Sequence, residues 1–208
     1  MPIEPTFRWV LLVIALPFLV AIHANFFRLK LSRATFYHAN EPLLLAASVR
    51  LCVVPCIVGL LLYMRAPQLM QWASVPLPSA ARWLGVPIMV AAEALFCWAL
   101  FSLGQNFSVS LAIFDQHALV TGGPYRFMRH PMYSAIMAMS AALFLTTANW
   151  FLGGSLLAAA LLVGVFRTPL EERTLSARFG DSYTHYAAHT GRFVPRFTRT
   201  ANARQEST

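Results

Sequence analysis

Long apolar runs alternate with short polar segments along this chain. Five of the runs are 17 residues or longer, and about 20 apolar residues are enough to cross the hydrocarbon core of a bilayer. The pattern therefore predicts an all-α, polytopic membrane protein with about five transmembrane helices. The expected helices are Phe7–Phe27, Leu43–Met64, Trp83–Leu103, Met132–Ala148 and Trp150–Phe166.

The last two runs are separated by a single polar residue, Asn149, which predicts a tight helical hairpin. The first run could instead be a cleavable secretory signal. Its leading segment carries Glu4 and only one arginine, and no small-x-small cleavage site follows it. We therefore interpret the first run as a retained helix.

Composition supports this interpretation and excludes other classes of protein. Of the 208 residues, 58% are hydrophobic and 12% are charged, whereas about one quarter are charged in soluble domains. The net charge of +8 does not indicate nucleic-acid binding, because the arginines lie in loops beside the apolar runs. Cys52, Cys56 and Cys97 lie inside apolar runs, at spacings that fit neither a disulfide framework nor a zinc site. We expect no metal and a single membrane domain.

The distribution of lysine and arginine predicts the orientation in the membrane. The loops on the side of the C-terminus carry twelve of these residues, seven of them from Arg167 onward, and the opposite loops carry three. Such residues concentrate on the cytoplasmic side of membrane proteins. We expect an outward N-terminus and a cytoplasmic C-terminus, as in a bacterial inner membrane, with a flexible tail at residues 197–208.

Two charged residues lie deep within the apolar runs. Arg50 and Glu93 are each eight to ten residues from the expected cytoplasmic end of their helix, or about 12–15 Å at 1.5 Å per residue. An unpaired charge at this depth costs several kcal/mol. We predict that Arg50 and Glu93 form a buried ion pair or reach one polar cavity. Such a pair would either only fix the packing of the helices or form a polar wall of a pocket, where both residues would contact substrate.

The polar segment before the fourth run has the most informative sequence. Residues 122–133 read Gly-Gly-Pro-Tyr-Arg-Phe-Met-Arg-His-Pro-Met-Tyr. The two glycines allow tight turns, and Pro131 suits the first position of a helix. Arg129 and His130 are therefore expected at a helix N-terminus, whose positive end attracts anions. This predicts a cytoplasmic anion site beside the hairpin.

A second polar segment follows the fifth run. Thr168, Pro169 and Glu171 have the spacing of a capping box with proline at the first helical position. That gives Glu171 a structural explanation and leaves Glu172 as the stronger functional candidate. Apolar and aromatic residues then recur at steps of four, four and three, which predicts one helix with an apolar face that covers a pocket. They are Leu175, Phe179, Tyr183 and Tyr186.

Together these segments resemble the isoprenylcysteine carboxyl methyltransferase family, in a wider group that includes phospholipid methyltransferases. Arg-His-Pro-x-Tyr combined with a pair of glutamates is much rarer by chance than a short isolated motif. The resemblance covers residues 103–196 as a cofactor-binding module, whereas residues 1–102 match only as apolar spans. The segments that carry it are Leu103–Val109, Leu119–Tyr133, Glu171–Tyr186 and Gly191–Arg196.

The resemblance implies an S-adenosylmethionine-dependent methyltransferase whose C-terminal half surrounds the cofactor. In the family's isoprenylcysteine enzymes, the arginine of the Arg-His-Pro motif and an arginine before the glutamates position the substrate. These correspond here to Arg129 and Arg167. The residues implied to contact S-adenosylmethionine are Gly123, Tyr125, His130, Pro131, Tyr133, Glu171, Glu172 and Tyr183.

The chemistry of the acceptor decides which residues are expected to be catalytic. A carboxylate acceptor is already ionised at neutral pH, so it needs no base, and Arg129 would hold it through charge-assisted hydrogen bonds. An amine or thiol acceptor loses a proton, which Glu172 or Tyr133 would take. We expect Arg129, Glu172 and Tyr133 in the catalytic centre and a hydrophobic or prenyl-like acceptor from the lipid bilayer.

Two other functions stay open at this point, together with the choice between O-, N- and S-methylation and the oligomeric state. A membrane reductase of the sterol-reductase type resembles the module but uses NADPH. A non-enzymatic scaffold or transporter is favoured by Arg50 and Glu93, because charges within a membrane often mark a pathway. Binding of S-adenosylmethionine, of NADPH or of neither separates the three.

Overall fold

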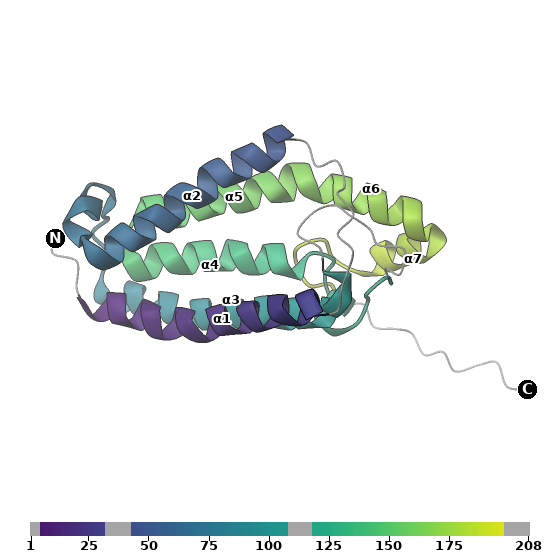
Figure 1. The fold of residues 1–208 in the computed structure, drawn as a ribbon, viewed down its shortest axis with the longest axis horizontal. Helices are drawn as coiled ribbons and strands as arrows, with labels where there is room; N and C mark the ends of the chain where they lie inside the picture. The colour runs from purple at the N-terminus through teal and green to yellow at the C-terminus, as the bar shows by residue number, and fades with distance from the viewer. Residues whose placement is uncertain (1–4, 32–42, 108–117, 198–208) are drawn as a thin grey trace, which may run out of the picture.

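The computed structural model describes residues 5–31, 43–107 and 118–197, and helices make up most of this part of the chain (Figure 1). No β-strand occurs within these residues, which confirms the predicted all-α architecture. The α-helices are α1 (Pro5–Leu31), α2 (Leu43–Arg65), α3 (Ser79–Leu103), α4 (Pro131–Thr147), α5 (Trp150–Leu162), α6 (Thr168–Phe179) and α7 (Asp181–His189). The short helical turns are η1 (Pro67–Ala73), η2 (Gly104–Asn106), η3 (Gly123–Arg126) and the π-helical η4 (Val163–Arg167).

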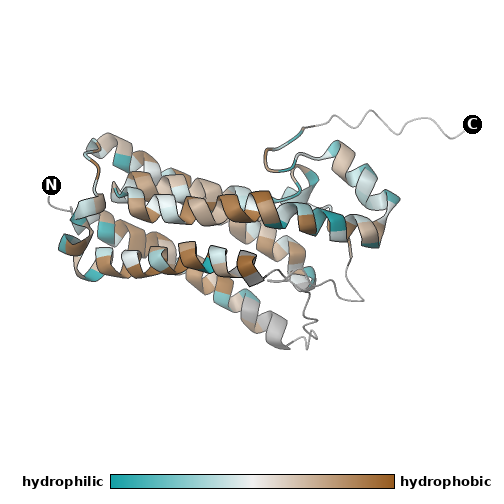
Figure 2. Ribbon diagram, turned by 90° about the horizontal axis from the view of Figure 1, so that it is seen from above, coloured by the Kyte–Doolittle hydropathy of each residue, from teal (hydrophilic) through white to brown (hydrophobic). Residues whose placement is uncertain are grey.

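Four of the helical stretches are long and apolar enough to cross a membrane, and α4 is a shorter apolar helix of 17 residues. Figure 2 shows apolar residues along the long helices and polar residues mainly near their ends. The predicted five apolar helices are therefore present. The four long stretches are Pro5–Asn25, Ala47–Arg65, Ser79–Leu103 and Trp150–Phe179.

Helix α4 lies in the middle of the bundle. It packs against α3 on one side and α5 on the other, while α1 covers α3 and α2 covers α5 (Figure 1). The α3–α4 contact is close because Gly85 has no side chain, and a Cβ there would lie 2.8 Å from the carbonyl oxygen of Ala142. Small residues allow such close approach between membrane helices.

The predicted hairpin at Asn149 is confirmed. Ala148 ends α4 in the left-handed conformation, with φ of 50°. Asn149 is fully buried, and its side chain accepts a hydrogen bond from Leu152 N at 3.2 Å, which caps α5. Its amide nitrogen donates to the carbonyl of Met70 at 3.0 Å, which ties the hairpin to η1.

Helix α5 continues into α6, so the predicted capping box is not formed. Thr168 donates to the carbonyl of Val163 at 3.3 Å, and Arg167 before it has helical backbone angles and no side-chain cap. A capping box needs a first residue outside the helix. Here the wider π-helical turn η4 carries the chain onward instead, a feature frequent at functional sites.

The expected single C-terminal helix is divided into two. Gly180 separates α6 from α7 with a φ of 52°, a left-handed conformation that favours glycine. Tyr183 and Tyr186 therefore belong to α7 and not to the helix that carries the glutamates. The break lets α7 lie at the end of the bundle beside η3 and the start of α4 (Figure 1).

Candidate functional site

The turn η3 packs against the last turns of α3, at the end of the bundle opposite to η1 (Figure 1). Gly123 opens this turn with a φ of 60°. A Cβ at Gly123 would collide with the hydroxyl of Ser102 and would lie 3.3 Å from Trp98 Nε1. Glycine is therefore needed here for both its backbone conformation and its small size.

The predicted position of the Arg-His-Pro motif at a helix N-terminus is confirmed. Pro131 is the first residue of α4 and His130 is its N-cap. The backbone N–H groups of Arg129 and His130 do not face open space, because they donate to the carbonyls of Gly191 at 2.8 Å and Arg192 at 3.0 Å.

Residues 190–196 form a segment with bends at residues 192–194, which we call the C-terminal strap. Gly191 N and Arg196 N both donate to the carbonyl of Phe127, at 3.2 and 2.9 Å. The hydroxyl of Ser134 donates to the carbonyl of Phe193 at 2.6 Å. These bonds hold the strap along residues 127–134, which we call the motif segment and which lie about 60 residues earlier in the chain.

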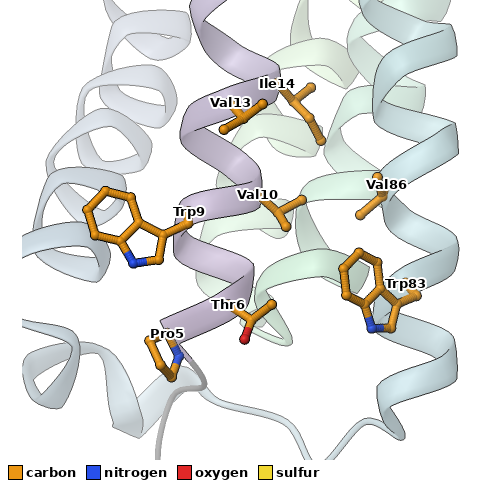
Figure 3. Close-up of a pocket in the computed structure, with 8 residues that line it drawn as sticks. All are labelled: Pro5, Thr6, Trp9, Val10, Val13, Ile14, Trp83 and Val86. Atoms are coloured by element: carbon orange, nitrogen blue, oxygen red, sulfur yellow. The ribbon is translucent and has the colours of Figure 1, made fainter.

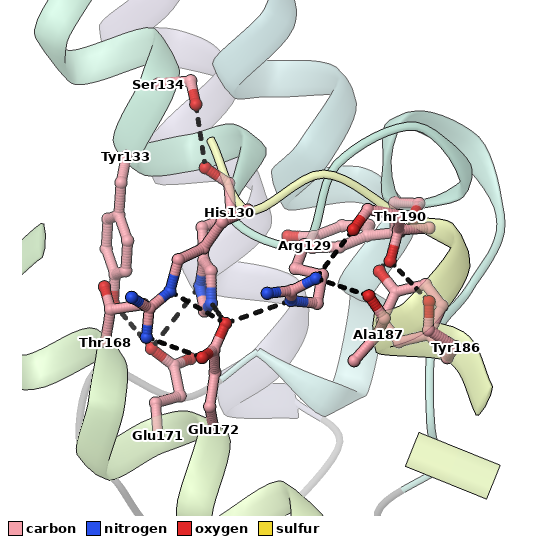
Figure 4. Close-up of polar contacts among 12 residues, drawn as sticks. Arg129, His130, Tyr133, Ser134, Thr168, Glu171, Glu172, Tyr186, Ala187 and Thr190 are labelled. Atoms are coloured by element: carbon pink, nitrogen blue, oxygen red, sulfur yellow. Dashed lines mark hydrogen bonds and ion pairs between the residues drawn. The ribbon is translucent and has the colours of Figure 1, made fainter. Parts of the chain in front are cut away.

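Glu172 is the residue on which the charged side chains converge (Figure 4). Its Oε1 accepts from Arg129 Nε at 3.0 Å, and His130 Nε2 lies 3.1 Å away. Arg192 adds two further bonds, from Nε to Oε1 at 3.1 Å and from Nη2 to Oε2 at 2.6 Å. A carboxylate can only accept, so the proton on His130 Nε2 points to Glu172. Three basic side chains from two segments therefore meet one acidic side chain of α6.

Glu171 has different partners from its neighbour. Tyr133 donates its hydroxyl proton to Glu171 Oε2 at 3.0 Å, and His130 Nδ1 lies 4.0 Å from the same oxygen. The rings of His130 and Tyr133 are stacked, with centroids 5.6 Å apart. The side chain of Glu171 is 36% exposed against 18% for Glu172, so Glu171 is the more accessible carboxylate.

Arg129 also joins α7 to the site. Its Nη1 donates to the carbonyls of Ala187 at 2.8 Å and Thr190 at 2.7 Å (Figure 4). Tyr186 donates its hydroxyl proton to the carbonyl of Tyr125 at 2.8 Å, so α7 also holds η3. The motif segment, α6, α7 and the strap thus form one connected polar cluster.

Tyr183 has a buried hydroxyl without a hydrogen-bond partner among the residues that the structure describes. Its side chain is 5% exposed. An unpaired buried hydroxyl is costly and usually indicates a missing partner such as a ligand or water. Burial, with a smaller effect of the Glu172 charge, raises the pKa of Tyr183 above its ordinary value.

Two further tyrosines of the cluster are neutral at physiological pH. Burial raises the pKa of Tyr125 well above its usual range, and the nearby charge of Glu171 adds to the effect. Burial also raises the pKa of Tyr186, to about 12. These phenols are hydrogen-bond donors at neutral pH and not bases.

The residues predicted to contact substrate lie on three different elements. Arg50 is exposed on α2 and Glu93 is half-buried on α3, and the described residues show no salt bridge between them. The ion pair predicted from the sequence is therefore not formed, because α2 packs against α5 and α3 packs against α4 and α1. Arg167 is half-buried at the end of η4. Contact of these three residues with substrate stays a prediction.

Arg192 is the site residue to which the sequence analysis gives no role. It lies within the Gly-Arg-Phe-Val-Pro-Arg segment that contributes to the family resemblance. This is the sequence feature that could have indicated a role for Arg192. Its contact with Glu172 joins positions 20 residues apart. The local sequence pattern does not reveal this contact, because the contact depends on how α7 and the strap fold back onto the bundle.

A separate groove of about 660 Å³ lies between α1 and α3 near the opposite end of the bundle (Figure 3). Its lining is almost entirely apolar and includes two tryptophans, Trp9 and Trp83. None of the residues of the polar cluster lines it. The full lining is Pro5, Thr6, Trp9, Val10, Val13, Ile14, Trp83 and Val86.

Comparison with known proteins gives the same family as the motif. Residues 83–177 match the isoprenylcysteine carboxyl methyltransferase (ICMT) family. Protein-S-isoprenylcysteine O-methyltransferase B of Arabidopsis thaliana is 32% identical over 116 residues, which are 53% of this chain and 57% of that protein. The human protein-S-isoprenylcysteine O-methyltransferase is 35% identical over 127 residues, or 58% of this chain and 41% of that protein. The chain thus spans about half the length of these curated relatives.

A solved structure shares the fold. The eukaryotic intramembrane Ras methyltransferase ICMT, solved without a monobody, superposes with a TM-score of 0.50 and 23% sequence identity. The similarity covers 76% of this chain and 54% of the other. The family match, the curated relatives and the fold thus show an integral membrane protein with several apolar helices, in which residues 83–177 are similar to the ICMT family.

Proposed function

We propose that this protein is an S-adenosylmethionine-dependent methyltransferase that methylates the carboxylate of a hydrophobic, prenyl-like acceptor at the cytoplasmic face of the membrane. The observation that carries the proposal is the polar cluster at the end of an apolar bundle. It combines Arg129, His130 and Tyr133 with Glu171 and Glu172. Its position gives a polar ligand and a lipid-soluble ligand access to neighbouring surfaces.

The residues of the cluster fit the polar parts of S-adenosylmethionine. The hydroxyl of Tyr183, which has no partner among the described residues, is free to form a hydrogen bond with a ligand. The accessible carboxylate of Glu171 can bind an ammonium group. Gly123 and Tyr125, which belong to η3, would contact the same ligand. When bound, S-adenosylmethionine supplies an electrophilic methyl group on a sulfonium centre. The fixed polar groups orient the donor and exclude water from it.

The bonding within the cluster favours a carboxylate acceptor over an amine or a thiol. Glu172 is occupied by Arg129, His130 and Arg192, and Glu171 accepts from Tyr133. An amine or thiol would need a base to take its proton. A carboxylate is ionised at neutral pH, and a positioned arginine such as Arg129 can orient it. The S-isoprenylcysteine O-methyltransferases named above are relatives whose names describe this kind of acceptor.

The test is donor binding followed by methyl transfer. We would titrate the purified full chain in detergent with S-adenosylhomocysteine by calorimetry, and with NADPH in parallel. We expect binding of S-adenosylhomocysteine at micromolar concentration and none of NADPH. His130→Ala should abolish binding, because it removes the ring that lies between both glutamates. His185→Ala is the control, because His185 is exposed on α7 and its ring packs on His189.

Transfer of a labelled methyl group then identifies the acceptor. An S-prenylated cysteine with a free carboxylate should be methylated, and the same compound as its carboxamide should not. Methylation of an aminolipid instead would overturn the carboxylate assignment. Binding of NADPH without binding of S-adenosylhomocysteine would overturn the proposed activity in favour of a reductase.

A further inference from the structure

The side chain of Arg192 fixes the plane of the Glu172 carboxylate. Its Nε and Nη2 bond both oxygens of Glu172, at 3.1 and 2.6 Å. Arg129 and His130 each reach only Oε1. A bidentate guanidinium–carboxylate pair sets an orientation that single bonds leave variable. Arg192, which belongs to the strap, therefore sets the direction in which Oε1 of Glu172 faces Arg129 and His130.

The backbone of Arg192 holds the same motif segment. Its carbonyl accepts the backbone N–H of His130 at 3.0 Å, and the carbonyl of Gly191 accepts that of Arg129 at 2.8 Å. A closed ring of bonds results, from the His130 backbone to Arg192, from the Arg192 side chain to Glu172, and from Glu172 back to the His130 ring. Networks of this kind act as a unit.

We propose that Arg192 is a positioning residue for the methyl donor, which acts through Glu172 to hold Arg129 and His130 in their binding orientation. The proposal rests on the proposed function, because donor binding is its readout. Arg192 is 40% exposed at its side chain, so it is placed at the rim of the cluster and does not itself need to touch the donor.

The strap supplies a matched control in Arg196. Its backbone N–H also bonds Phe127, at 2.9 Å, but its side chain donates to the carbonyl of Ala188 and is exposed. Arg196→Gln and Arg192→Gln therefore remove the same charge from the same segment. The two differ in that the Arg192 side chain reaches Glu172.

The experiment is a double-mutant cycle on the full chain in detergent, with the affinity for S-adenosylhomocysteine measured by calorimetry. We expect Arg192→Gln to weaken binding by about tenfold, the size usual for a lost bond to a charged group. Arg192→Lys should recover part of the lost affinity, because lysine keeps the positive charge but lacks the two parallel N–H donors of the guanidinium group. In a Glu172→Gln background, Arg192→Gln should weaken binding no further. Arg196→Gln should leave binding unchanged.

Two results would overturn the proposal. One is an equal effect of Arg192→Gln in the parent and in Glu172→Gln, which would show that Arg192 does not act through Glu172. The other is an Arg192→Gln variant as harmless as Arg196→Gln. If Arg192→Gln does not fold, Arg192→Lys takes its place in the same cycle.

Failure of the proposed function would be seen separately. A folded parent protein that binds no S-adenosylhomocysteine refutes the methyltransferase proposal. The cycle is then measured by melting temperature, where additive effects of Arg192→Gln and Glu172→Gln overturn the coupling as well.

Discussion

Glu171 and Glu172 are adjacent in the sequence, but their carboxylates have different surroundings. Glu172 accepts from Arg129, His130 and Arg192 and is largely enclosed. Glu171 accepts from Tyr133 and is the more exposed of the two. The capping-box interpretation of Glu171 is therefore replaced by a place in the polar cluster, and Glu172 holds the cluster together. Residue type alone does not separate the two roles, because adjacent helical positions face different neighbours.

The unpartnered hydroxyl of Tyr183 gives a prediction at this scale. Tyr183→Phe removes a buried polar group that makes no hydrogen bond with a described residue, so the melting temperature of the donor-free protein should stay the same or rise. If the hydroxyl binds the donor, affinity for S-adenosylhomocysteine should fall about tenfold, or 1.4 kcal/mol. Thermal unfolding and calorimetry on the same sample measure both effects.

Tyr186→Phe is the matched comparison. Its hydroxyl donates to the carbonyl of Tyr125 at 2.8 Å, so its loss should destabilise the protein by about 1 kcal/mol. A Tyr183→Phe variant that loses stability as Tyr186→Phe does, with unchanged donor affinity, would contradict the ligand role of Tyr183.

The turn η3 shows how an element depends on one backbone conformation. Gly123→Ala should destabilise this turn by about 1–2 kcal/mol, because alanine is strained at a positive φ and its Cβ would meet Ser102. Donor affinity should fall with it, since η3 carries Tyr125. The melting temperature and the calorimetric affinity report the two effects.

Gly122→Ala provides the control for this element. Gly122 has an extended conformation, and a Cβ there would meet no atom within 4 Å. Such a substitution should stay within about 0.5 kcal/mol of the parent. Equal losses from Gly122→Ala and Gly123→Ala would show that the conformation of η3 is not what the site requires.

The elements that depend on local sequence pattern were predictable from the sequence. The elements that depend on how distant parts of the chain pack together were not. The apolar runs gave the five helices, and Asn149 gave the hairpin, because both follow from burial and capping within a few residues. The π-helical turn before Thr168 and the break at Gly180 depend on how α6 meets the rest of the bundle. The contact of Arg192 with Glu172 has the same origin.

The orientation of the whole molecule is a prediction that labelling can test. Gln71 is exposed in η1 and Ser182 is exposed in α7, at opposite ends of the bundle (Figure 1). The positive-inside rule places α7 in the cytoplasm. In intact cells, a membrane-impermeant maleimide should label Gln71→Cys, whereas Ser182→Cys should react only after permeabilisation. The parent, whose three cysteines lie in apolar helices, gives the background. The reverse pattern would invert the orientation.

The α4–α5 hairpin has a consequence for how the protein is made. Arg129 and Glu172 are 43 residues apart in the chain and come from the two free ends of the hairpin, whose turn at Asn149 lies at the other end of the bundle. Apolar helices pack against one another within a bilayer through close contacts of small residues. A nascent chain whose hairpin is still outside the membrane therefore has no assembled cluster. We therefore expect the cluster, and with it the proposed ligand binding, to form only after insertion into the membrane.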